Sequence, residues 1–255
     1  MAIQTTIRTT AALLVLLSTG AQAFAPSHGS MSKAAASASS SSQLYGKFSK
    51  EELVKMTKEY LASSTPDKLA DDYVFRGPVI GPLVKKEFHK NTAEDYGAEE
   101  KSNNVYDAFP DYELNAFGFT ADDPIDENRV WYFVRPRGTF TEHYDHPIKG
   151  RIEPTGAPLI APPEARSVTW NDDGKIQFET VGYVTDRFTG DTTGGKGAVF
   201  AHFHVMGEDL DGNPGSLSMR FRQWLGNMLP DVPNSFSKPE EIPSWWTDKR
   251  MGAEK

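Results

Sequence analysis

Two segments rich in β-branched and aromatic residues, 166–171 and 175–185, lie on either side of a turn signal. The turn reads Asn-Asp-Asp-Gly at 171–174, and its glycine can adopt the positive φ that a tight turn requires. This pattern predicts a β-hairpin. Because an isolated hairpin is at best marginally stable in water, the chain must supply further strands or helices to cover it.

Helices are expected before this hairpin. Ser49 and Glu52 have the spacing of a capping box, in which the serine accepts an amide proton and the glutamate reaches back to the cap. Two shorter helices are expected, one opened by Thr65 and Pro66 and one over 84–92.

Further strands are expected over 73–75, 112–119 and 129–140. The segment 143–163 is expected to be an excursion that carries Pro and Gly, and the apolar run 198–206 fits either a helix or a strand. An amphipathic helix is expected over 217–229. Helices followed by antiparallel strands predict an α+β domain, with helices on one face of a curved sheet.

The first 43 residues are not expected to belong to this domain. Arg8 precedes a short apolar segment, 11–17, that is too short to span a bilayer. Ala-Gln-Ala at 21–23 then has the small-x-small pattern of a signal-peptidase site. We therefore expect a signal peptide over 1–23.

A segment rich in Ser and Ala follows over 24–43, with Lys33 and no acidic residue before Glu51, which is a transit-like composition. Ala-Phe-Ala-Pro at 23–26 resembles the bipartite plastid presequences of diatoms and related algae. The resemblance implies import through the secretory pathway into the chloroplast stroma of an alga with a secondary plastid. The absence of cysteine from all 255 residues agrees with a reducing compartment, and plain secretion is the alternative.

The net charge limits the partners of the mature chain. The full sequence has 27 basic and 35 acidic residues, and removal of Arg8 and Lys33 with the first 43 residues leaves 25 against 35. Such an acidic chain repels phosphate backbones and anionic lipid surfaces, so nucleic-acid binding is not expected. No segment after residue 43 has the length and apolar character of a transmembrane helix.

Five short motifs occur in a distinctive order: Ala-Asp-Asp-Tyr-Val-Phe-Arg-Gly-Pro at 70–78, Phe-Pro-Asp-Tyr-Glu at 109–113, Arg-Gly-Thr-Phe-Thr at 137–141, Glu-Pro-Thr-Gly at 153–156 and Asp-Gly-Lys-Ile at 173–176. Together they resemble the SnoaL-like polyketide cyclases of the NTF2-like superfamily over roughly residues 50–195. The resemblance implies a cone-shaped α+β barrel that encloses an apolar pocket. We expect this domain over 44–195 and a C-terminal extension over 196–255.

Alternate strand positions and several tyrosines are the expected walls of such a pocket, since alternate side chains of a strand point to one face. The candidate binding residues are Tyr73, Tyr112, Trp131, Phe133, Phe140 and Phe178. A tyrosine in an apolar wall can orient a carbonyl by donating a hydrogen bond, and Tyr183 is a further candidate. The alternative is that these side chains fill a solid core.

Asp186, at the end of the last strand, is the leading catalytic candidate. The family resemblance implies that it is the acid/base of a ring closure, and partial burial would raise its pKa towards neutrality. Phe140 replaces the histidine of the family's Gly-Thr-His-Thr element, and His143 or, alternatively, His146 is the candidate substitute. In the alternative interpretation, Asp186 caps the turn that follows the strand.

Neither a metal nor a cofactor is expected. In Glu-His-Tyr-Asp-His at 142–146, His143 and Asp145 share a strand face but His146 does not, which disfavours a three-ligand site. The segment 190–197 imitates a phosphate loop, but it ends in Gly197 and lacks the hydroxyl that would bind magnesium.

Two functions remain from the sequence. The first is cofactor-free acid/base cyclisation or isomerisation of a hydrophobic small molecule in the plastid. The second is a non-catalytic protein that binds pigment or lipid or assists assembly, which Phe140 and the tail tryptophans Trp224, Trp245 and Trp246 favour. The family resemblance also implies a homodimer formed through the sheet face.

Overall fold

The computed structural model describes residues 47–63, 66–92, 104–146, 149–210, 213–228 and 234–249. The chain separates into two units, Met1–Gln43 and Leu44–Lys255, and all described residues belong to the second. The expected signal peptide, the transit-like segment and the Thr65 cap lie outside the described residues.

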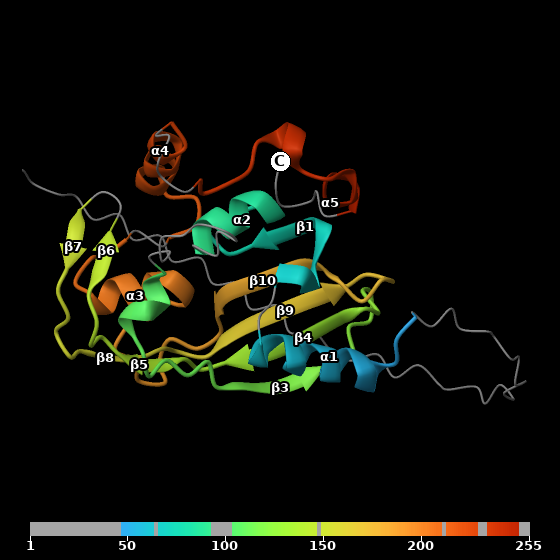
Figure 1. Ribbon diagram of the computed structural model, residues 1–255, viewed down its shortest axis with the longest axis horizontal. Helices are drawn as coiled ribbons and strands as arrows, with labels where there is room; N and C mark the ends of the chain where they lie inside the picture. Colours follow the sequence, from blue (N-terminus) through green and yellow to red (C-terminus); the bar gives the residue numbers. More distant parts are fainter. Residues whose placement is uncertain are drawn as a thin grey trace, which may run out of the picture. The chain divides into compact units, whose positions relative to one another are not determined.

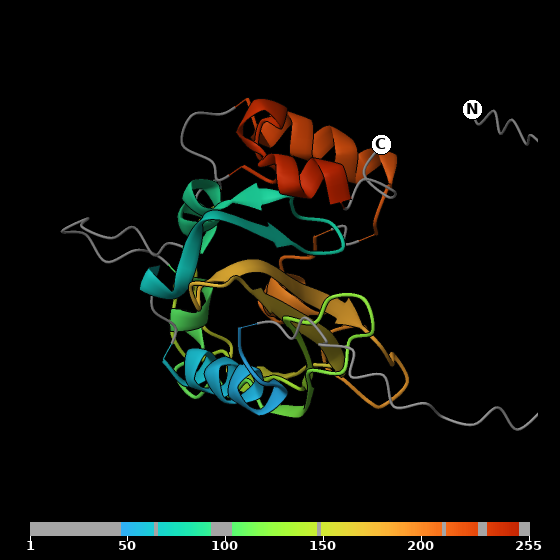
Figure 2. The same cartoon turned by 90° about the vertical axis from the view of Figure 1, so that its right-hand side faces the viewer.

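A six-stranded curved sheet organises the domain (Figure 1, Figure 2). Its strand order is β2-β1-β10-β9-β4-β3. The strands are β1 (Leu69–Arg76), β2 (Leu83–Val84), β3 (Ala116–Thr120), β4 (Arg129–Val134), β9 (Glu164–Trp170) and β10 (Ile176–Val184). β1 and β10 run parallel and the other neighbours run antiparallel, so the expected antiparallel sheet is mixed. β2 and β3 are its edges, and the sheet does not close into a barrel within the described residues.

The predicted hairpin is confirmed as β9 and β10. Gly174 adopts a φ of 69°, and its amide donates to the Asn171 carbonyl at 3.0 Å. The hairpin does not alternate regularly, because the register of β10 against β9 shifts between Ile176 and Phe178 and again between Thr180 and Tyr183. Each shift changes which side chains face a given side of the sheet.

Helix α1 (Lys50–Ala62) covers the concave face of the sheet and packs against β3 and β4. Its predicted capping box is confirmed, with Glu52 N donating to Ser49 Oγ at 3.2 Å and Ser49 N donating to Glu52 Oε2 at 2.7 Å. The other predicted helices appear as the short η1 (Pro66–Lys68) and as α2 (Lys85–Thr92), which packs on β1 and β2. The α+β class is therefore confirmed.

The main core lies between α1 and the sheet. Thr57 accepts a hydrogen bond from Trp170 Nε1 at 3.0 Å, which ties the helix to the central strand. The fully or nearly fully buried apolar side chains of this core are Leu53, Tyr60, Leu69, Tyr73, Ala121, Val130, Tyr132, Val134, Val168, Trp170 and Ile176.

A second layer of small elements extends one end of the sheet. It contains η2 (Val105–Ala108), β5 (Arg137–Thr139) paired with β8 (Pro158–Ile160), and β6 (Tyr144–His146) paired with β7 (Gly150–Ile152). Three short strands lie within the segment 143–163, which was expected as an excursion that carries Pro and Gly. Strands of three residues are too short to show an alternating pattern in the sequence.

The apolar run that fitted helix or strand is helix α3 (Ala198–Val205), which packs against η2, β8 and β10. The C-terminal extension continues with α4 (Leu217–Gly226), η3 (Pro239–Glu241) and α5 (Ser244–Lys249). No helix among the described residues has the length and apolar character needed to span a bilayer.

The C-terminal extension packs onto the convex face of the sheet, opposite α1 (Figure 2). Trp246 is buried against Val74 of β1 and Phe178 of β10, with ring centroids of Trp246 and Phe178 5.0 Å apart. Trp245 Nε1 donates to the Asp72 carbonyl at 3.1 Å. This part of the convex face is therefore covered by the chain's own tail.

Replacement of Trp246 by alanine is expected to lower the free energy of unfolding by about 3 kcal/mol, because it removes a buried indole and leaves a cavity. Urea denaturation of the full chain measures this loss. Phe188, which is 97% exposed, provides the control, and Phe188→Ala should change stability by less than about 0.5 kcal/mol. Equal stability of the two variants would show that the tail is not docked.

Candidate active site

A buried ion pair lies where β9 begins, on the concave side of the sheet. Arg166 Nε and Nη2 donate to Glu164 Oε2 at 3.3 and 3.0 Å. The other carboxylate oxygen, Oε1, accepts the Ala198 amide at 2.8 Å, at the start of α3. Residue 197 must be glycine for this approach, because a Cβ there would lie 2.9 Å from Glu164 Cδ. Glu164 thus joins the sheet to α3.

The positive charge of Arg166 is retained despite its burial. Burial alone would lower the pKa of Arg166, but the Glu164 carboxylate and the neighbouring tyrosines raise it above its ordinary value. The guanidinium is therefore protonated over the whole range in which the protein would be folded. A permanent positive charge inside the domain can stabilise negative charge that develops on a ligand.

A second carboxylate, Glu179, faces the same side from β10. The register shift after Ile176 places Glu179 opposite Val168, which belongs to the core under α1. Its Oε2 accepts hydrogen bonds from the hydroxyls of Tyr60 at 3.2 Å and Tyr73 at 3.0 Å. Burial, followed by the charge of Glu179, raises the pKa of Tyr73 well above its ordinary value, so its phenol remains a donor.

Two polar atoms near these carboxylates are buried without a hydrogen-bond partner among the described residues. They are the Tyr132 hydroxyl on β4 and His202 Nε2 on α3. Burial raises the pKa of Tyr132, and the charge of Glu179 raises it further while Arg166 opposes this. A buried polar atom without a partner costs about 1–3 kcal/mol, so both atoms are suited to a ligand or an ordered water.

His202 is held as a neutral ring. Its Nδ1 lies 3.0 Å from the Ala198 carbonyl, so Nδ1 carries the proton and Nε2 is left as an acceptor. Burial lowers the pKa of His202 to about 4, and the charge of Arg166 contributes in the same direction. The ring packs against Tyr106, Phe109 and Tyr112 with centroid separations of 4.8, 5.0 and 5.3 Å.

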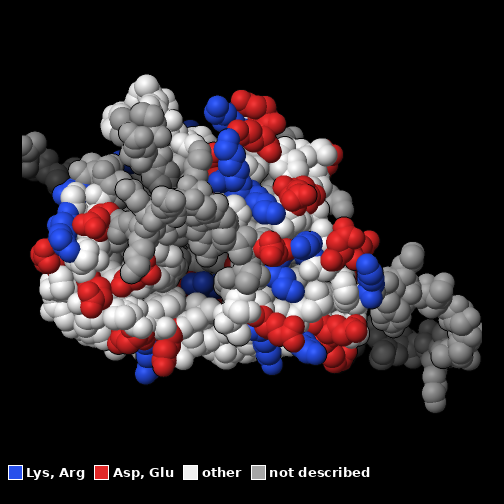
Figure 3. Space-filling view, viewed as in Figure 1, with Lys and Arg blue, Asp and Glu red and all other residues white. Residues whose placement is uncertain are grey.

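These groups form one set, which we call the buried polar cluster: Tyr60, Tyr73, Tyr106, Tyr112, Tyr132, Glu164, Arg166, Glu179 and His202. Glu164 is neutralised by Arg166, whereas the hydrogen bonds described for Glu179 come from neutral phenols. The face drawn in Figure 3 is hollowed near its middle, with a basic side chain at the floor.

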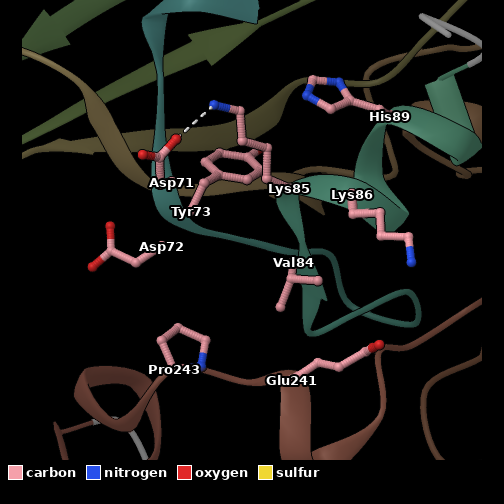
Figure 4. A pocket seen from close by; sticks show the side chains of 9 residues that line it. All are labelled: Asp71, Asp72, Tyr73, Val84, Lys85, Lys86, His89, Glu241 and Pro243. Atoms are coloured by element: carbon pink, nitrogen blue, oxygen red, sulfur yellow. Dashed lines mark hydrogen bonds and ion pairs between the residues drawn. The ribbon is translucent and has the colours of Figure 1, made fainter.

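A separate open cleft of about 600 Å³ lies between β1, α2 and the C-terminal extension. Figure 4 shows Asp71 and Lys85 pointing toward one another beside Tyr73, with Glu241 and Pro243 across the opening. Lys85 Nζ is 3.4 Å from Asp71 Oδ1. Of the six binding candidates from the sequence, Tyr73 alone is among the residues that line this cleft.

The catalytic candidates from the sequence lie on the surface. Asp186 is exposed, and its Oδ1 accepts the Phe188 amide at 2.8 Å. It therefore caps the turn beyond β10, and the expectation that it is buried is wrong. Tyr183 is 41% exposed after the second register shift, and exposed His143 lies 3.6 Å from Asp145. The structure does not bring these three residues into the buried polar cluster.

Three of the expected lining residues lie on the convex face, which corrects their expected orientation. Trp131 donates its Nε1 to Asp123 at 2.8 Å, and Phe133, 38% exposed, stacks on Phe117. Phe178 faces the tail because of the shift in β10. The even-numbered residues of β4, such as Tyr132, face α1 instead.

Of the other three lining candidates, Tyr73 and Phe140 are buried and Tyr112 is partly buried. Tyr73 and Tyr112 belong to the buried polar cluster, and burial raises the pKa of Tyr112 above its ordinary value. Phe140 is completely buried, with its ring centroid 5.6 Å from that of Phe109. Their part in binding stays a prediction.

Sequence reasoning did not select Glu164, Arg166, Glu179, Tyr132 or His202 as candidate site residues. The available signal was a charged residue inside a strand that reads as buried, as in Glu-Ala-Arg-Ser-Val-Thr-Trp at 164–170. Such residues are rarely buried without a partner, so their presence there indicates a paired or functional site. No group of three or more metal-binding side chains occurs within the described part of the chain.

No family model matches the sequence, and no curated protein matches it. Among solved structures, the chain is similar to a protein described as a SnoaL-like polyketide cyclase from Jannaschia sp. CCS1, at 12% identity and a TM-score of 0.35, over 52% of this chain and 85% of that one. It is similar to a phenazine biosynthesis-related protein from Pseudomonas aeruginosa, at 12% identity and a TM-score of 0.36, over 66% and 90%. It is also similar to a steroid delta-isomerase from Pseudomonas aeruginosa, at 14% identity and a TM-score of 0.31, over 69% of this chain and 93% of that one.

The depressed pKa of His202 predicts a pH dependence of stability. Above about pH 6.5 the ring is neutral in both states, whereas between about pH 6.5 and 4 the unfolded chain binds a proton that the folded chain does not. Stability is therefore expected to fall by about 3 kcal/mol through that window as the pH is lowered.

Urea denaturation at about pH 7 and about pH 4.5 measures this loss. His202→Phe should remove most of it, and burial of His146 leaves a smaller dependence in both chains. His143→Phe, at an exposed position, is the matched control and should keep the wild-type dependence. A His202→Phe chain with an unchanged pH dependence would contradict the assignment.

Proposed function

We propose that this protein is a cofactor-free acid/base enzyme that cyclises or isomerises a hydrophobic small molecule bearing a carbonyl group, at the buried polar cluster. The observation that carries the proposal is the pair of buried atoms without partners among the described residues, Tyr132 Oη and His202 Nε2, beside Glu179 and Arg166. A carbonyl oxygen can accept from the tyrosine, and a hydroxyl of the substrate can donate to the histidine.

In the proposed reaction, Glu179 is the general base. Its carboxylate takes a proton from the carbon next to the carbonyl, and the electrons of that C–H bond form the C=C bond of an enolate. Tyr132 donates a hydrogen bond to the enolate oxygen, and the Arg166 charge stabilises it. In an isomerisation the proton returns to another carbon; in a cyclisation the enolate carbon attacks a second carbonyl, whose oxygen takes the proton.

The tyrosines support this assignment in two ways. Tyr60 and Tyr73 hold Oε2 of Glu179 in a fixed position, which limits the reorganisation needed for proton transfer. The raised pKa values of Tyr73 and Tyr132 keep both phenols protonated, so that they act as donors. Asp186 is not carried into the mechanism because it is exposed and caps a turn.

A binding protein without catalysis is the second candidate. The aromatic surroundings of His202, which include Phe109 and fully buried Phe140, favour a ligand with rings. Such a protein would need the same shape of site but no general base. Substitution of Glu179 distinguishes the two functions.

Glu179→Gln is expected to abolish catalysis, with a loss of about 10²–10⁴-fold, because an amide cannot accept the proton. A deletion strain of the source organism is complemented with wild type, Glu179→Gln or Asp186→Asn, and metabolites and pigments are profiled. The deletion and the Glu179→Gln strain should accumulate the same precursor.

Asp186→Asn is the matched control, because it makes the same chemical change at an exposed carboxylate, and it should restore the wild-type profile. Full restoration by Glu179→Gln would favour the binding function. If Asp186→Asn fails to restore the profile while Glu179→Gln restores it, the catalytic residue is Asp186 at the end of the last strand. Thermal denaturation of each variant confirms that it is folded.

We further propose that the protein is imported into a plastid, on the basis of the apolar segment 11–17 and Ala-Phe-Ala-Pro at 23–26. A fluorescent protein fused behind residues 1–43 should accumulate in the plastid of a diatom. Phe24→Ala should divert it to an earlier compartment of the secretory route, and Phe48→Ala, in the same fusion extended to residue 50, is the control. Secretion of the unaltered fusion would contradict the proposal.

A further inference from the structure

Helix α4 carries a continuous apolar stripe that faces solvent. The exposed fractions are 82% for Leu217, 61% for Phe221, 56% for Trp224, 45% for Leu225 and 62% for Met228, which lies just beyond the helix. At about 100° per residue these side chains fall within one arc of about 100°, the width of a stripe that normally faces a core. No described part of the protein covers it.

The stripe is held in this orientation by the opposite side of the helix. Met219 is 8% exposed, and Gln223 Nε2 donates to the Val79 carbonyl at 2.8 Å. Asn227, the C-cap residue, accepts the Ser235 amide at 3.0 Å, and Ser216 caps the N-terminus. The helix is therefore fixed to the protein by one side and presents the apolar side outward.

Charge around the stripe differs from that of the rest of the chain. Arg220 and Arg222 are exposed and flank the stripe on its two sides at about 100° per residue. Residues 213–228 contain no acidic side chain, although the chain after residue 43 carries 25 basic and 35 acidic residues. The helix is thus a basic, apolar element on an acidic protein.

We propose that α4 docks the protein onto the surface of a lipid bilayer that contains anionic headgroups. The five apolar side chains enter the boundary between headgroups and acyl chains, and the arginines extend to lipid phosphates on both sides. Trp224 and the arginines have the chemistry preferred at membrane interfaces. The protein as a whole is acidic, but electrostatic interaction between protein and lipid headgroups falls off within a Debye length. The charges of α4 next to the bilayer therefore decide binding.

The arginines also argue against a second copy of this chain on the stripe. In a two-fold contact the same surface faces itself, so the two apolar stripes would bring flanking arginines of both copies together without an acidic partner on the helix. An anionic bilayer offers acyl chains to the apolar stripe and negatively charged headgroups to the arginines on either side of it.

The test uses the full chain and phosphatidylcholine vesicles with or without about one third phosphatidylglycerol. Flotation should show binding that weakens at high salt. Phe221→Ser with Trp224→Ser should reduce binding to the anionic vesicles by about tenfold or more, since it removes two large apolar side chains. Arg220→Gln with Arg222→Gln should give about a tenfold loss with anionic vesicles and little change with neutral ones.

A local measurement separates α4 from any contribution of residues 1–43. Lipids brominated near the headgroup should quench tryptophan fluorescence in the wild type, and Trp224→Phe should remove most of that quenching while vesicle binding is retained. Trp245→Phe, in the tail that packs on the sheet, is the matched control and should leave the quenching unchanged.

Equal vesicle binding by wild type and both double variants would overturn the proposal, as would quenching that does not depend on Trp224. A wild-type chain that ignores vesicles but dimerises through α4, with dimers lost in Phe221→Ser with Trp224→Ser, would also overturn it and assign the stripe to a second copy. Because the substituted side chains are exposed, thermal stability of the variants should match the wild type.

Discussion

The Glu164 carboxylate is the interaction on which the arrangement of the domain depends. It is completely buried, and its two oxygens are used by different parts of the chain, Arg166 on the sheet and the first amide of α3. A buried carboxylate is tolerated only when it is paired and hydrogen-bonded. Loss of Arg166 would leave it without a compensating charge, and loss of the amide contact would leave a buried acceptor without a donor. The position of α3, and with it that of His202 and its aromatic neighbours, is therefore set from the start of β9.

The sequence predicted the parts of the fold that local rules determine. The Asn-Asp-Asp-Gly turn and the Ser49 capping box depend on residues close together in the chain, and both are confirmed. The orientation of side chains on β10 could not be predicted, because the two register shifts follow from pairing with β9. One shift moves Phe178 to the tail side and Glu179 to the helix side, which reverses the expected pocket lining.

Dependence on contacts between distant parts of the chain also explains why the sequence did not identify the residues of the buried polar cluster. Its position at the end of the last strand and the family resemblance selected Asp186, and the charged residues inside the strands were not considered. Although the charged residues inside β9 are visible in the sequence, the tyrosines and the histidine that α1, β1 and α3 place around Glu179 and Arg166 are not. These partners are distant in the sequence, so only tertiary structure shows that the charged side chains meet on one face.

The tail has a consequence for the site that lies across the sheet from it. Trp246 presses on Phe178, and the next residue of the same strand, Glu179, points to the opposite face. The tail thus supports β10, the strand that carries the proposed base, from the opposite face of the sheet. Proteolytic removal of α5, or a fusion that displaces it, would remove the support of Phe178 and so shift Glu179, the next residue of the strand. The geometry of the proposed site therefore depends on an intact last helix.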